Sequence, residues 1–118
     1  DKLMEVYVYS RTGSLYEVDG HQPGEYIDYA IQDYGRYSDL ARNYPGLAKK
    51  GMIQASSEFA QGRIISSWDA ERIKSEGYGG TMVFSLNPNN GYASRLSTIT
   101  QAFYGEATIR TGNYAKDW

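Results

Sequence analysis

The sequence predicts a single α+β domain with about five or six short strands and two or three short helices. The alternating Val and Tyr residues of Glu5–Ser10 predict a strand. Trp68–Lys74, followed by Gly77, predicts a helix, and the apolar segment Thr81–Leu86 predicts a further strand. The chain has 118 residues, of which 41% are hydrophobic and 22% charged. This length supports one hydrophobic core but not two, so we expect residues 1–118 to form one domain.

The remaining segments are assigned from the spacing of their apolar residues. Apolar side chains recur at helical spacing between residues 25 and 35, and again from Tyr37 to Ala41, which predicts two short helices. The residues Asn43–Gly46 are expected to end the second one. Three additional strands are predicted: 51–57, 63–67 and 102–110. The segment 94–100 fits either type of element.

Composition excludes several classes of site. The chain has no cysteine, so it cannot form a disulfide or a thiolate metal site, and its single histidine argues against a zinc site or a two-histidine ribonuclease centre. The net charge of −2 argues against a general nucleic-acid-binding surface, which usually carries a basic excess. No apolar run approaches the ~18 residues of a membrane span. The chain begins at Asp1 without a signal-peptide pattern, and whether a signal was removed stays open.

Arg11 and the pair Ser66 and Ser67 stand at the ends of two predicted strands. An arginine at a strand end can donate two parallel hydrogen bonds to a phosphate, although an exposed surface arginine is the simpler interpretation. A serine hydroxyl can hold a catalytic carboxylate in place. Ser67 is also suited to cap the helix that Trp68 begins, and capping alone would account for it.

Glu106 lies in an otherwise uncharged predicted strand. Because neighbouring side chains of a strand alternate between its faces, Tyr104, Glu106 and Thr108 would share one face. A carboxylate in a cleft on that face could stabilise an oxocarbenium-like sugar and bind a ribose hydroxyl. An exposed glutamate on an edge strand is the alternative.

An arginine, a serine and a glutamate in this order on three strands resemble the cholera, heat-labile enterotoxin and pertussis group of mono-ADP-ribosyltransferase toxins. The resemblance covers most of the chain in short matches. The segments that carry it are Asp1–Leu3 with Ser10-Arg11, Glu25–Asp28, Tyr37–Arg42, Gly62–Ser67 and Gly105–Ile109.

This resemblance implies a fold in which two small, mostly antiparallel sheets form a cleft that binds NAD as a substrate, with no metal. It implies that Arg11 holds the NAD phosphates, that Ser66 and Ser67 organise the site, and that Tyr78 or Tyr104 flanks the nicotinamide. Glu106 would then be the catalytic residue. A protein acceptor, and secretion or delivery as a toxin effector, follow from the same resemblance.

The chain departs from the family pattern at several positions, and the departure at the paired acids bears most directly on the reaction. The Glu-x-Glu pair of these toxins becomes Tyr104-Gly105-Glu106, so the first acid is lost. That acid helps to activate an arginine acceptor in the family. The resemblance therefore predicts NAD hydrolysis, or transfer to a group other than arginine.

Two other hypotheses remain open from the sequence. Twelve tyrosines indicate either strand packing or a protein-binding face, so a non-enzymatic immunity, inhibitor or adhesion domain is the main alternative. A small nuclease toxin is a third hypothesis. It requires His21 to face a basic cleft, which the acidic balance does not favour.

Overall fold

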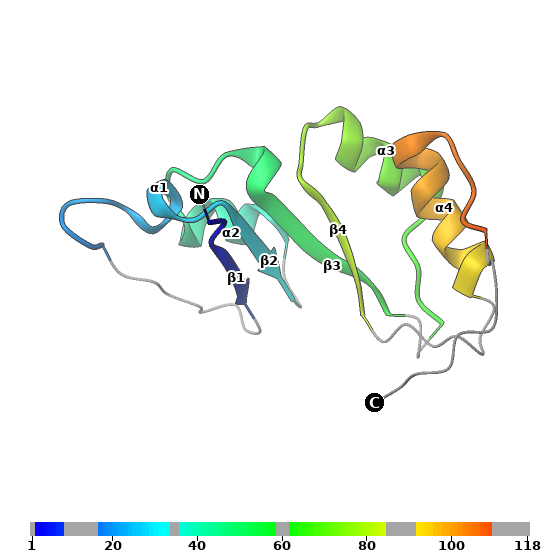
Figure 1. Cartoon of the computed structure of the whole chain (residues 1–118), viewed down its shortest axis with the longest axis horizontal. Coiled ribbons are helices and arrows are strands. Elements are labelled where there is room, and N and C mark those ends of the chain that lie inside the picture. Colours follow the sequence, from blue (N-terminus) through cyan, green and yellow to red (C-terminus); the bar gives the residue numbers. More distant parts are fainter. Residues whose placement is uncertain (1, 9–16, 34–35, 59–61, 85–91, 110–118) are drawn as a thin grey trace.

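The computed structural model describes residues 2–8, 17–33, 36–58, 62–84 and 92–109, and it contains one four-stranded sheet (Figure 1). The strands follow each other in the order β1-β2-β3-β4, and every neighbouring pair is parallel. They span Glu5–Val8 (β1), Tyr29–Gln32 (β2), Met52–Glu58 (β3) and Gly80–Phe84 (β4).

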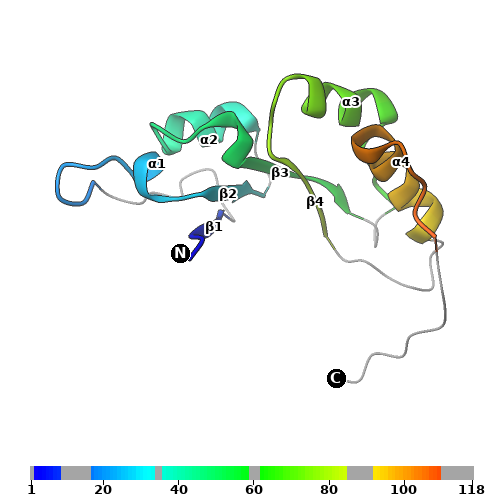
Figure 2. The same cartoon turned by 45° about the horizontal axis from the view of Figure 1, so that its top comes forward.

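Helical segments separate successive strands, as parallel neighbours require, since a tight hairpin cannot join them, and one further helix follows the last strand. They span Pro23–Tyr26 (α1), Tyr37–Asn43 (α2), Lys49–Gly51 (the 3-10 turn η1), Ser67–Ser75 (α3) and Tyr92–Tyr104 (α4). Helices α2 and α3 lie on the same side of the sheet, and α4 packs against α3 beyond β4 (Figure 2). None of the helices in the described part of the chain has the length and apolar character needed to cross a membrane.

The strand register separates the side chains of the sheet into two faces. Val6, Ala30 and Met52 are aligned across β1, β2 and β3, and Ala30 and Met52 are buried beneath the helices. Tyr7, Ile31 and Ile53 form the next aligned row, and strand alternation turns this row to the opposite face. None of the described helices covers that face (Figure 2).

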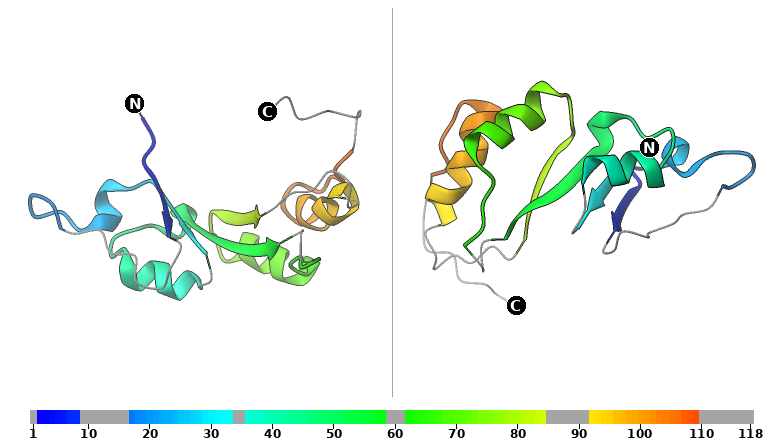
Figure 3. Two further views of the ribbon diagram at one scale, coloured as in Figure 1. Left: turned by 90° about the horizontal axis from the view of Figure 1, so that it is seen from below. Right: turned by 180° about the vertical axis from the view of Figure 1, so that it is seen from behind.

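The buried side chains form two clusters rather than one. The first joins the sheet to α2 and comprises Val8, Ile27, Ala30, Leu40, Tyr44, Leu47 and Met52. The second joins α3 to α4 and comprises Ile65, Ala70, Ile73 and Ile99. We call the part of the fold around each cluster the first and the second lobe, and strand β3 runs from the first lobe into the second (Figure 3). The radius of gyration is 15.9 Å, whereas a compact domain of this length would have about 13 to 14 Å.

Tyr37 and Tyr78 connect the two clusters, because both rings pack against both of them. The ring centroids are 3.9 Å apart and the ring planes differ by 19°, which is a stacked arrangement. The Tyr37 hydroxyl donates a 2.7 Å hydrogen bond to the Gly80 carbonyl at the start of β4. The stack therefore ties α2 to the strand that leads out of α3.

The structure confirms the α+β class but not the sheet arrangement that was expected. There is one sheet, and it is parallel; the expectation of two small, mostly antiparallel sheets is wrong for the described residues. The predicted strand at 63–67 is wrong because residues 64–66 are a loop and α3 begins at Ser67. The predicted strand at 102–110 is also wrong, since residues 102–104 complete α4 and residues 105–109 pair with no strand.

The predicted helix over residues 25–35 is wrong as well. Helix α1 ends at Tyr26, and β2 follows from Tyr29 to Gln32. Ala30, Ile31 and Gln32 are all buried, and β2 lies between β1 and β3 in the sheet. Consecutive burial of this kind produces apolar spacings that also match a helix. The predicted strands at 5–10, 51–57 and 81–86 and the helices at 37–41 and 68–74 are confirmed with shifted ends. Residues 9–10 and 85–86 of these predictions lie outside the described residues.

We expect Gly24→Ala to lower the free energy of unfolding by about 3 kcal/mol, because a Cβ at Gly24 would overpack the contact between α1 and the turn after α2. An ideal Cβ there would lie 2.1 Å from the Leu47 nitrogen and 2.3 Å from the Pro45 carbonyl oxygen, both of which are backbone atoms. Gly77→Ala is the control: a Cβ at Gly77 meets nothing, but the positive φ of 79° disfavours alanine, which costs about 1 kcal/mol. Urea unfolding measures both. Equal losses would contradict the close packing of α1.

We expect Tyr37→Phe to cost about 1 kcal/mol at neutral pH through loss of the bond to Gly80. Burial disfavours the phenolate and raises the pKa of Tyr37 to about 12, from 10.0 in a model compound. The unfolded chain therefore ionises first, so this stabilisation is complete below pH 10 and is lost as the pH rises through 12. The advantage of the wild type over Tyr37→Phe should shrink across that range in urea unfolding. A difference that stays constant with pH would contradict the burial of this hydroxyl.

Candidate functional site

Ser66, one of the two predicted site serines, is the N-terminal cap of α3. Its Oγ accepts a 3.1 Å hydrogen bond from the Asp69 nitrogen and donates a 2.9 Å bond to the Asp69 carboxylate. Ser67 is the first helical residue and is exposed. The cap is thus one residue earlier than the sequence predicted, and capping accounts for the contacts of Ser66.

Among the other predicted site residues that the structure describes, Tyr78 packs between the two hydrophobic clusters, whereas Tyr104 and Glu106 lie at the end of α4 and just after it. Tyr78 is stacked on Tyr37, and the Lys49 Nζ lies 5.2 Å from the centroid of its ring. Tyr104 ends α4 with 77% of its surface exposed, and Glu106 is exposed two residues later. Arg11 lies outside the described residues.

Glu106 does not lie on a strand face with Tyr104 and Thr108, because no strand forms there. The segment after α4 turns back along the helix, and the Thr108 nitrogen donates to the Ser97 Oγ at 3.0 Å. Lys74 Nζ, at the end of α3, contacts the Ala102 carbonyl at 3.4 Å. This contact places the end of α4 at the side of the sheet where the strands begin.

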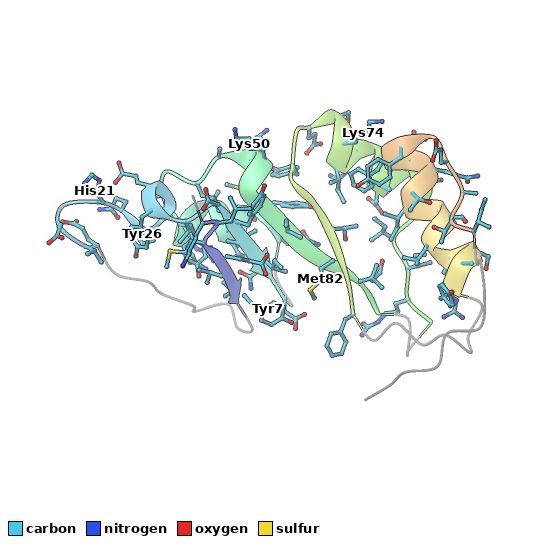
Figure 4. The ribbon with its side chains drawn as sticks, viewed as in Figure 1. Tyr7, His21, Tyr26, Lys50, Lys74 and Met82 are labelled. Carbon is cyan, nitrogen blue, oxygen red and sulfur yellow. The ribbon has the colours of Figure 1, made fainter. Side chains whose placement is uncertain are left out.

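The carboxyl ends of the strands form the opposite edge of the sheet, and ligands of parallel α/β sheets bind outside that edge. There, the Tyr7 hydroxyl donates a 2.5 Å hydrogen bond to Asp33 Oδ2. A bond this short between a hydroxyl and a carboxylate is typical of a charge-assisted pair. Figure 4 shows Tyr7 and Met82 toward this edge, with Lys50 and Lys74 toward the other. Tyr7 and Asp33 therefore form a polar pair where a ligand is expected.

Local backbone structure holds Asp33 in position. Asp33 follows Gln32, the last residue of β2, and its nitrogen donates to the Val8 carbonyl at 2.9 Å, which continues the pairing of β1 with β2. Gln32 is fully buried, and its Nε2 donates to the Asp33 carbonyl at 2.8 Å. The carboxylate consequently projects from a strand end that is anchored on both sides.

Apolar side chains lie beside this pair on the face that the helices leave uncovered. Strand alternation places Met82 and Phe84 of β4 on that face together with Tyr7. Tyr7 is 45% exposed and Phe84 is 52% exposed. This edge can accept hydrogen bonds from a ligand while packing against its apolar surface. Among the described residues, no group of three or more His, Cys, Asp or Glu side chains is placed to hold a metal ion.

Sequence reasoning missed Tyr7 and Asp33 as site residues. The pair depends on β1 and β2 being parallel neighbours, and residues 25–35 were expected to form a helix. A polar pair Gln32-Asp33 directly after a short apolar segment was the available signal. It points to a strand end only once that segment is known to be a strand.

Comparison with known proteins identifies two relatives, while no protein-family model matches the chain. The chain is 46% identical over 125 residues to endo-beta-N-acetylglucosaminidase F1 of Elizabethkingia meningoseptica; the match covers 100% of this chain and 37% of that protein. It is 31% identical over 110 residues to an endo-beta-N-acetylglucosaminidase of Flavobacterium sp. (strain SK1022), covering 90% of this chain and 33% of that protein. The chain thus spans about a third of the length of these curated relatives.

These relatives correct the functional expectation from the sequence. The chain is homologous to glycoside hydrolases, and the resemblance to ADP-ribosyltransferase toxins is contradicted. The expectations of NAD-dependent transfer or NAD hydrolysis, and of a toxin effector, fall with it, and so does the reason for assigning Arg11, Tyr104 and Glu106 to an NAD site. The alternative of a tyrosine-rich binding module is not supported either. The chain is similar over its whole length to part of an endo-beta-N-acetylglucosaminidase.

Proposed function

We propose that this chain forms part of an endo-β-N-acetylglucosaminidase, an enzyme that hydrolyses β-linked N-acetylglucosamine within a sugar chain. The observation that carries this proposal is the 46% identity to such an enzyme over the whole chain. The polar pair at the carboxyl edge of the sheet supports it, because it lies where parallel α/β enzymes bind their substrates.

The topology supports a place for the chain within a larger catalytic unit. All-parallel sheets normally have both faces covered, yet the described helices cover only one face here. A sheet whose helices all lie on one face can bury its other face by curling into a barrel. We infer that further strands continue the sheet beyond β1 and β4. The greater length of both relatives supports this inference.

Within this function, Tyr7 and Asp33 have a binding role. N-acetylglucosamine offers hydroxyl and amide donors together with an apolar ring face. The Asp33 carboxylate accepts hydrogen bonds from such donors, and the Tyr7 hydroxyl keeps that carboxylate oriented. Phe84 supplies exposed aromatic surface at the other end of the same edge.

Bond cleavage needs groups beyond this pair. Glycoside hydrolases commonly use two carboxyl groups that flank the scissile bond. Among the described side chains, Asp33 is the carboxylate at the carboxyl edge of the sheet. We therefore assign Asp33 to substrate binding and expect the rest of the enzyme to contribute to the hydrolytic chemistry.

A chimera tests this proposal. The matched segment of the Elizabethkingia meningoseptica relative is replaced by this chain, and hydrolysis of that relative's substrate is measured. We expect the chimera to be active and Asp33→Asn to lower its kcat/KM by about 10- to 100-fold, the effect of losing a hydrogen bond to a charged group.

Asp28→Asn is the matched control. Asp28 precedes the same strand, at the opposite edge of the sheet, where its carboxylate accepts a 2.8 Å bond from the Met4 nitrogen. Asp28→Asn should leave kcat/KM within about twofold, because this carboxylate lies away from the proposed site. A well-folded chimera without activity would overturn the proposed function. Equal effects of the two substitutions would overturn the role of Asp33.

A further inference from the structure

A groove between α2 and α3 lies on the helix-bearing face of the sheet, opposite the face of Tyr7. It comprises two adjoining cavities of about 340 Å³ and 560 Å³. Tyr37, Gln54, Arg72 and Ile73 line both of them, which makes the groove continuous along α3. Cavities of this size accommodate a ligand of several rings.

The charges in the groove are balanced. Arg36 and Glu76 line the smaller cavity, Asp69 lines the larger one, and Arg72 lines both. The groove lining thus contains two guanidinium groups and two carboxylates. An anionic ligand would meet the carboxylates and a cationic ligand the guanidinium groups, so the lining favours a neutral ligand with both donors and acceptors.

Polar and aromatic groups complete the lining. The amide of Gln54 and the hydroxyl of Ser66 add hydrogen-bonding groups, and the stacked rings of Tyr37 and Tyr78 form part of the smaller cavity. The Arg72 guanidinium also lies 5.2 Å from the centroid of the Trp68 ring. Trp68 is 67% exposed. Trp68 and Arg72 are one helical turn apart, so the exposed indole lies beside a residue that lines the groove.

We propose that this groove binds a neutral oligosaccharide as a second sugar site, separate from the carboxyl edge of the sheet. Sugars are neutral, present many hydroxyls that both donate and accept, and pack an apolar ring face on aromatic side chains. The choice of N-acetylglucosamine oligosaccharides as the ligand class rests on the proposed function. A second site on the far side of the sheet would hold a long sugar chain near the enzyme while the first site acts on it.

Nuclear magnetic resonance titration of the ¹⁵N-labelled 118-residue chain tests this proposal. The probe is a trisaccharide of β-linked N-acetylglucosamine. We expect saturable shifts of the Gln54 side-chain amide and of the backbone amides of Arg72 and Tyr78, which surround the groove.

Arg72→Ala and Arg42→Ala are the matched variants. Each removes an exposed arginine that pairs with an aspartate three residues earlier, Asp69 or Asp39, but only Arg72 lines the groove. We expect Arg72→Ala to weaken trisaccharide binding at the groove at least about tenfold, and Arg42→Ala to leave it unchanged. Equal affinities of the two variants would overturn the proposal.

The variant Asp33→Asn distinguishes sugar binding at the groove from sugar binding at the carboxyl edge. If the groove signals shift and still do so in Asp33→Asn, the second site is supported. Shifts confined to the amides around Tyr7 and Asp33 would overturn the groove site and leave the proposed function standing. Shifts confined to the groove would support the second site and count against sugar binding at the carboxyl edge. The absence of shifts at both places would overturn the groove site and weaken the proposed function as well.

Discussion

The stack of Tyr37 on Tyr78 is the contact on which the arrangement of this chain depends. Both rings pack against both hydrophobic clusters. The Tyr37 hydroxyl also donates a hydrogen bond to the carbonyl of Gly80, the first residue of β4. Without the stack, the α3–α4 pair would be joined to the first lobe chiefly through the pairing of β3 with β4. Because Tyr37 also lines both cavities between α2 and α3, the same contact shapes the groove.

The one-sided covering of the sheet explains both the extended shape and the position of the candidate site. Successive parallel strands with their helices on one side leave a second face, on which Tyr7, Met82 and Phe84 lie. In a globular protein such a face is normally buried. The carboxyl edge where this face ends carries the Tyr7–Asp33 pair. Fold and site thus support the same proposal, in which the chain contributes to a larger enzyme.

Two chemically different surfaces result from this layout. The carboxyl edge combines a carboxylate with apolar and aromatic side chains of the uncovered face. The groove on the helix-bearing face combines paired opposite charges with stacked tyrosines. In the proposed function the first surface orients a sugar for the reaction, and in the proposed second site the groove holds a neutral sugar chain without acting on it. The sheet separates them, so each can be altered by substitution without removing the other.

Local sequence signals by themselves determined the elements whose residues interact mainly with each other. The Val and Tyr alternation of β1, the helix that Ser66 caps, and the strand after Gly79-Gly80 were all predictable, because propensity and capping act within a few residues. Tertiary structure decided the rest. Segment 29–32 became an interior parallel strand despite helical spacing, and residues 105–109 remained unpaired. Only parallel pairing, a contact between residues about 25 positions apart, brought Tyr7 to Asp33. Since pairing partners are chosen by burial over the whole sheet, no local pattern identifies them.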